Sequence, residues 1–98
     1  MHEIRSQHSN NPITVTFRNE STQTIELMWY NFQGEHVSYG KIAPGNGMGM
    51  NTFATHPWSA YMVEGDREHP HFLIDGNGVY DPVAGDNGRD IIITDNED

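Results

Sequence analysis

Short runs of alternating apolar and polar residues divide the chain, and residues that favour turns separate these runs. In the first run, PITVTFRN, the side chains of Ile13, Val15 and Phe17 alternate with polar ones, as in a half-buried strand. Similar runs recur roughly every 8 to 12 residues, and no segment has a helical period. The pattern predicts an all-β fold, an antiparallel β-sandwich of seven to eight short strands, with a small barrel as the alternative.

The second run, TIELMWYNF, is apolar on both faces, so we expect both faces to be covered. Alternation assigns Ile25, Leu27 and Trp29 to one face and Met28, Tyr30 and Phe32 to the other. The turn signal PGNG precedes further strands, and VYDPVAG and DIIITD are expected to close the sandwich. We expect a flexible segment at residues 1–11, the sandwich at 12–95 and a frayed acidic tail at 96–98.

The charge of the chain limits its partners. The 98 residues carry a formal charge of −9, and only five of them are Lys or Arg. This charge repels phosphate backbones and anionic surfaces, so neither nucleic acid nor a membrane is an expected partner. A chain of this length argues for one domain with one core, and we expect a monomer.

The sequence contains no cysteine, which favours a reducing compartment and hence a cytoplasmic location. No apolar run approaches the ~18 residues that a membrane-spanning helix needs. The N-terminal residues MHEIRSQHSNN have no apolar centre, and we expect no signal peptide.

Two motifs suggest metal binding, and each has a simpler interpretation. His69 and His71 in EHPHF could form a metal site with His56 or His36, but exposed loop histidines are favoured. DGNGVYD at residues 75–81 resembles half of a calcium loop, but it lacks the bidentate Glu and suits a hairpin turn better. We therefore expect neither a metal ion nor another cofactor.

Two further motifs could mark sites of catalysis and modification. Thr52, His56 and Asp66 could supply a nucleophilic triad, but the sequence has no nucleophile elbow. We therefore do not expect an enzyme. Asn19 in NES matches an N-glycosylation acceptor, although its place at a strand end also suits a turn.

The aromatic residues of the central region favour a binding pocket more strongly than any of these motifs. They lie on separate expected strands or at strand ends, and they are Trp29, Tyr39, Phe53, Trp58 and Tyr61. Some of them must form the core of so small a sandwich. If the two Trp and Tyr39 meet near Thr52 and His56, they form an aromatic box with two groups that bind a hydroxyl. Tyr61 is assigned to the sheet.

An ordered set of motifs in residues 13–82 resembles the β domain of the von Hippel–Lindau (VHL) family. The set comprises F-x-N with Ser two residues on, W-x-N-F-x-G-E, Tyr followed by P-G-x-G, and Ser or Thr with H-x-W four residues later. The resemblance implies a seven-stranded β-sandwich that binds a peptide containing 4-hydroxyproline. In that family a following helical domain recruits Elongin C and a ubiquitin ligase. The chain stops where that domain would begin, so the resemblance implies no Elongin C partner here.

The resemblance assigns roles to residues of this sequence. Trp29 matches the pocket Trp of the second strand, Tyr39 matches a Tyr that hydrogen-bonds the peptide backbone, and Trp58 matches the floor of the pocket. Thr52 matches a Ser, and with His56 it would bind the prolyl hydroxyl. The resemblance thus implies a pocket that prefers hydroxyproline to proline.

Besides the conservative change from Ser to Thr52, three positions depart from the family pattern. Asn51 replaces a His that contacts the peptide backbone, Phe53 replaces a Tyr, and Gly40 replaces a Pro. These departures concern the residues that flank hydroxyproline in the ligand more than the pocket. Alternatives from other classes remain: a carbohydrate-binding module, because aromatic platforms also suit sugar rings, or a structural interaction domain whose vestigial pocket is packed shut.

Overall fold

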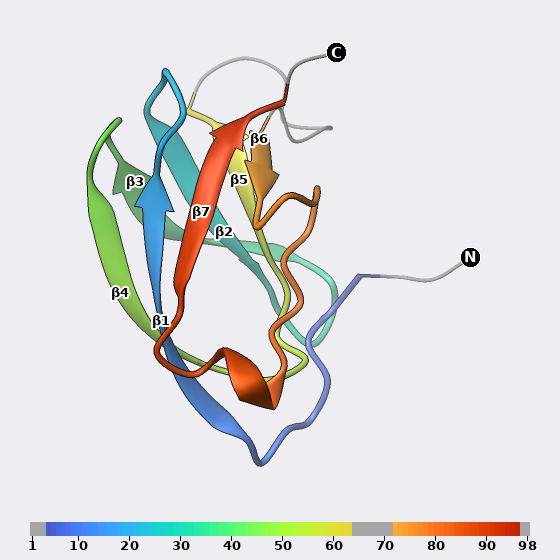
Figure 1. Cartoon of the computed structure of the whole chain (residues 1–98). Helices are drawn as coiled ribbons and strands as arrows, with labels where there is room; N and C mark the ends of the chain where they lie inside the picture. The colour runs from blue at the N-terminus through green and yellow to red at the C-terminus, as the bar shows by residue number, and fades with distance from the viewer. Residues whose placement is uncertain (1–3, 64–71, 97–98) are drawn as a thin grey trace.

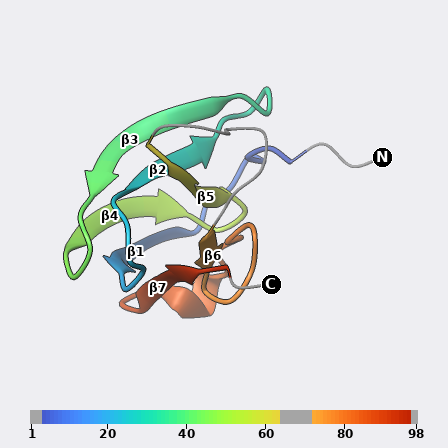
Figure 2. The same ribbon diagram turned by 90° about the horizontal axis from the view of Figure 1, so that it is seen from above.

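A computed structural model describes residues 4–63 and 72–96 and shows a β-sandwich of two sheets (Figures 1 and 2). In the four-stranded sheet the strand order is β4-β1-β7-β6, and in the three-stranded sheet it is β3-β2-β5. The strands are Pro12–Asn19 (β1), Ile25–Tyr30 (β2), His36–Ile42 (β3), Gly47–Phe53 (β4), Trp58–Met62 (β5), Phe72–Ile74 (β6) and Asp90–Asp95 (β7). The predicted β-sandwich is therefore confirmed.

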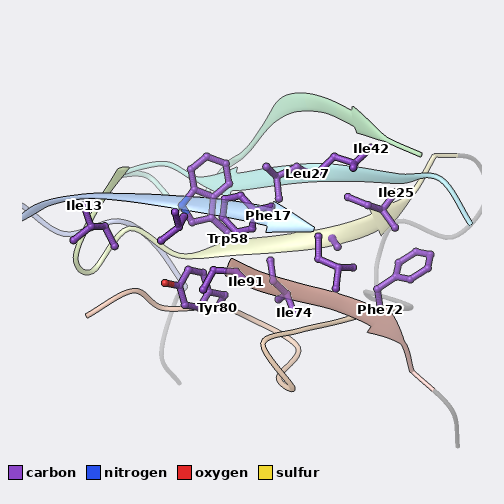
Figure 3. Close-up of a cluster of buried hydrophobic side chains, with 13 residues drawn as sticks. Ile13, Phe17, Ile25, Leu27, Ile42, Trp58, Phe72, Ile74, Tyr80 and Ile91 are labelled. Atoms are coloured by element: carbon purple, nitrogen blue, oxygen red, sulfur yellow. The ribbon is translucent and has the colours of Figure 1, made fainter. Parts of the chain in front are cut away.

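Alternation along β1 sets one half of the core. Ile13, Val15 and Phe17 are buried, whereas their polar neighbours along the strand are exposed or half-buried. Figure 3 shows these apolar side chains meeting those of the other sheet, with Trp58 beside Phe17. The hydrophobic core lies between the two sheets, because each sheet turns one face toward the other.

The second strand follows the predicted alternation up to its end. Ile25 and Leu27 are fully buried in the core, and Met28 and Tyr30 are buried on the opposite face. The assignment of Phe32 to that opposite face is wrong. β2 ends at Tyr30, so Phe32 lies in the following turn, where alternation no longer applies.

Two features of the closing segments differ from the sequence-based expectation. β7 pairs with β1 in parallel, so the sandwich is not antiparallel throughout. VYDPVAG forms an isolated bridge between Tyr80 and Trp58 and a 3₁₀ turn, Ala84–Asp86 (η1), rather than a strand. Pro82 explains this departure, because proline has no N–H to donate to a strand ladder.

The chain crosses between the two sheets on either side of β4. After β3, the turn at residues 43–46 carries the chain from the three-stranded to the four-stranded sheet. After β4, residues 54–57 return it to β5 in the three-stranded sheet. Both crossings are short, so the end of β3 lies near the start of β4, and the end of β4 lies near the start of β5.

The N-terminal segment that precedes β1 makes specific contacts. Ser6 is buried, and Ser6 and Gln7 both donate backbone hydrogen bonds to other parts of the sandwich. The expected tail at residues 96–98 falls mostly outside the described residues. In the described part of the chain, no helix is long and apolar enough to cross a bilayer.

The remaining sequence motifs have structural roles where they are described. Asn19 is buried, and its side-chain amide donates to the carbonyls of Gln23 and Ile42, so a glycan could not be attached to it in the folded domain. Backbone hydrogen bonds between Ile74 and Asn77 close the DGNG turn. Within residues 4–63 and 72–96, no cluster of three potential metal ligands occurs. His69 and His71 lie outside these residues.

A polar network joins η1 to the start of β7. Asp86 is buried and accepts hydrogen bonds from the Tyr80 hydroxyl at 2.9 Å, the Val83 N–H and the Arg89 guanidinium. Arg89 also binds Asp75 at 2.9 Å. Burial alone would raise the pKa of Asp86, but the hydrogen bonds from Arg89, Tyr80 and Val83 together lower it.

Replacing Asp86 with Asn should therefore destabilise the domain by about 1–3 kcal/mol, because the one oxygen of an amide cannot accept from Tyr80 and Val83 on one side and from Arg89 on the other. The pKa of Asp86 is lower in the folded domain than in the unfolded chain. The ionised carboxylate therefore contributes its full stabilisation above the unfolded-state pKa of about 3.9, and this contribution is lost as the pH falls through the folded-state pKa. Urea denaturation at neutral and acidic pH measures both effects. A loss that is as large in acid as at neutral pH would contradict the assignment to the ionised carboxylate.

Candidate functional site

A small cavity of about 200 Å³ opens where β4 crosses to β5. Its lining residues come from both sheets, from the turn after β2 and from the β4–β5 turn: Trp29, Phe32, Tyr39, Asn51, Thr52, Phe53, His56 and Trp58. The seven residues assigned to the site from the sequence all line this one cavity. Phe32 is the residue that the sequence assignment missed.

The rings of the cavity do not lie in one plane. Trp29 stands at 90° to Tyr39 with ring centroids 6.2 Å apart, and Tyr39 stands at 67° to Trp58 at 5.1 Å. Phe32 meets His56 at 87° and 5.4 Å, whereas Trp29 and Phe53 are tilted by 38° and 44° against His56. These contacts make an aromatic box and not a flat platform.

Tyr39 reaches the cavity from a bulge in β3. The pairing of β2 with β3 shifts register between Glu26 and Met28. Two residues of β3, Tyr39 and Gly40, therefore lie opposite the single residue Leu27 of β2. Gly40 has a φ of 113°, which L side chains rarely adopt and which proline cannot adopt. The glycine found here in place of the family proline therefore permits a local backbone that proline would exclude.

Two polar side chains of the cavity have defined hydrogen-bond senses. The Trp58 indole Nε1–H donates to Thr52 Oγ1 at 3.1 Å, so the Thr52 hydroxyl acts there as an acceptor and keeps a proton to donate. Nε2 of His56 is buried without a partner among the described residues. In the tautomer that carries its proton on Nδ1, this nitrogen is an acceptor.

Burial keeps His56 neutral. Desolvation lowers the pKa of His56 below its usual value, and the hydrogen bond to Gln7 opposes this shift without cancelling it. A neutral ring has one N–H and one lone pair on its two nitrogens. Among the described residues, the cavity thus holds an unpartnered ring nitrogen of His56 and a Thr52 hydroxyl that can donate.

The rim of the cavity is apolar with one amide. Phe32, Tyr39 and Phe53 are each about two-fifths exposed (44%, 43% and 39%). Thr14 donates from its hydroxyl to Asn51 Oδ1 at 2.9 Å, which leaves the amide N–H groups of Asn51 for a ligand carbonyl. An extended peptide could therefore pair with the rim while one of its side chains enters the box.

The alternative triad lacks support in the described residues. A nucleophile needs a hydrogen bond to its base, yet Thr52 accepts from Trp58 and His56 Nε2 has no partner. Asp66 lies outside the described residues. Tyr61 is buried in β5, where its hydroxyl bonds that of Tyr30 at 3.2 Å, so it belongs to the sheet as expected.

Comparison with known families agrees with the fold. The model of the VHL beta domain matches residues 4–88, which is nearly the whole chain. Domains of this family recognise protein substrates and are not enzymes. The match includes every residue that lines the cavity. The chain therefore belongs to the VHL β-domain family.

Proposed function

We propose that the domain binds 4-hydroxyproline in an extended segment of a protein partner. The observation that carries this proposal is that one aromatic box holds both a buried ring nitrogen, His56 Nε2, with no partner among the described residues, and the Thr52 hydroxyl, which keeps a proton to donate. A ligand hydroxyl would donate to His56 and accept from Thr52, so both of its hydrogen-bonding capacities are used. Proline would leave both protein groups unpaired.

The box suits the pyrrolidine ring in size and chemistry. A cavity of about 200 Å³ is smaller than the roughly 300–1,000 Å³ of pockets for drug-sized ligands, so it suits one small ring. Trp29, Tyr39 and Trp58 give that ring apolar surfaces on several sides. A segment that contains prolines is already extended, so little conformational entropy is lost when it binds.

The same geometry favours a peptide over a sugar. Carbohydrate platforms expose coplanar rings to a broad ligand, whereas the neighbouring rings here stand at angles of 38° to 90° to one another. The vestigial alternative requires the three rings to be packed shut, but a cavity remains between them. These observations support peptide recognition as the function to test first.

The test is calorimetric titration with two peptides that differ only in hydroxyproline or proline. We expect the hydroxylated peptide to bind at least roughly tenfold more tightly, because each buried group left unpaired costs about 1–3 kcal/mol. Equal affinity for both peptides, or no binding of either, would refute the proposal. A glycan array run in parallel tests the carbohydrate alternative directly.

A further inference from the structure

The turn that presents His56 has an unfavourable backbone. The His56 N–H donates to the Phe53 carbonyl at 3.2 Å and closes a four-residue turn. Its third residue, Thr55, has a φ of 65°, a left-handed conformation that β-branched residues rarely adopt. Such a conformation persists only where surrounding contacts hold it, so the turn depends on partners outside itself.

Two residues of the N-terminal segment, Ser6 and Gln7, provide such partners, and we name them the strap. The N–H and hydroxyl of Ser6 donate to the carbonyls of Asn31 (3.0 Å) and Tyr30 (2.6 Å) at the end of β2. The Gln7 N–H donates to the Thr55 carbonyl at 3.1 Å, and the Thr55 hydroxyl donates back to Gln7 at 3.2 Å. The strap therefore ties the β2 side of the cavity to the β4–β5 turn.

The strap also lies close to His56 itself. His56 follows Thr55 in the turn, so the two hydrogen bonds between Gln7 and Thr55 hold the backbone from which the His56 ring enters the cavity. The backbone of Gln7 also raises the pKa of His56, which is the effect of a carbonyl next to a ring N–H. Nε2 of the ring is buried without a partner among the described residues, so a carbonyl acceptor at Nδ1–H would leave Nε2 with its lone pair for a ligand.

We infer that the strap is a positioning element of the pocket, which holds the turn at Thr55 and with it keeps the His56 ring in one orientation and one tautomer. Ser6 and Gln7 act through His56 and are not assigned a contact with the ligand. For its effect on binding, the inference rests on the proposed recognition of hydroxyproline. The tautomer of His56, however, is a property of the free protein and can be measured without any ligand.

Gln7 offers a matched pair of variants for the test. Gln7→Pro removes the N–H that binds Thr55, whereas Gln7→Ala changes only an exposed side chain and keeps both backbone groups. In Gln7→Pro we expect the preference for hydroxyproline over proline to fall roughly five- to tenfold, as the loss of one positioned hydrogen bond implies. Gln7→Ala should keep the preference of the parent protein.

The second readout is the ¹⁵N chemical shift of the two His56 ring nitrogens in the free proteins. We expect the parent and Gln7→Ala to show protonated Nδ1 and bare Nε2, and Gln7→Pro to show a mixture. If the parent shows protonated Nε2, or if Gln7→Pro keeps both the tautomer and the preference, the inference is wrong. If the parent binds both peptides equally, the proposed function fails, and the ring shifts still decide the role of the strap. If Gln7→Pro does not fold, Ser6→Ala replaces it, because this variant loses only the hydroxyl bond to Tyr30. The preference for hydroxyproline and the ring shifts of His56 then test the inference in the same way.

Discussion

Replacing Trp58 with alanine is expected to lower the free energy of unfolding by about 3–5 kcal/mol, a large part of the roughly 5–15 kcal/mol that stabilises a domain. The side chain is only 2% exposed, and its ring packs 5.2 Å from Phe17 and 5.1 Å from Tyr39. Its removal also leaves the buried Thr52 hydroxyl without its donor. Urea denaturation followed by circular dichroism measures the loss, and much of the variant should be unfolded at physiological temperature.

Trp29→Ala is the matched control, because Trp29 lines the same cavity but is only partly buried. This variant should lose much less stability than Trp58→Ala, yet it should bind the hydroxyproline peptide poorly, since one wall of the box is missing. Equal losses of stability in the two variants would contradict the distinction between a core residue and a wall residue. The comparison also shows why loss of binding in Trp58→Ala alone could not identify a contact with the ligand.

Much of the fold could be predicted because strand periodicity fixes which face a residue occupies. The alternation of Ile13, Val15 and Phe17 gave their burial correctly, and the turn residues separated the strands. The pairing of β1 with β7 in parallel could not be predicted, because the two strands are far apart in the sequence. The alternation predicted the wrong face for Phe32, because a pattern of alternating residues does not show that β2 ends at Tyr30.

The candidate site could be assembled from the sequence only through the ordered motifs shared with the VHL family. Periodicity placed Trp29 and Trp58 on strands, but it did not bring them together. Phe32 belongs to the same W-x-N-F-x-G-E motif as Trp29, and this is the signal that could have identified it. The strap carries no such signal, because Ser6 and Gln7 act mainly through backbone groups that every residue possesses.

Replacing His56 with alanine is expected to remove most of the preference for hydroxyproline over proline, at least roughly a tenfold change in the ratio of affinities. His56 Nε2 is the buried acceptor for the ligand hydroxyl in the proposed complex, and alanine provides none. Affinity for the proline peptide should change much less, because proline does not use this acceptor. Calorimetry on both peptides measures the ratio, and His36→Ala, at an exposed position of β3, is the control.

The pH dependence of binding provides an independent check on the same group. Burial lowers the pKa of His56 below the usual value of about 6.5, so His56 remains neutral at physiological pH. The pKa of His56 is lower in the folded domain than in the unfolded chain. The contribution of neutral His56 to stability is therefore complete above the unfolded-state pKa, and it is lost as the pH falls through the folded-state pKa. Protonation also removes the lone pair of Nε2, so affinity for the hydroxyproline peptide should fall over the same acidic range. Affinity for the proline peptide should not fall with it, and a parallel decline of both would mean that His56 does not contact the hydroxyl.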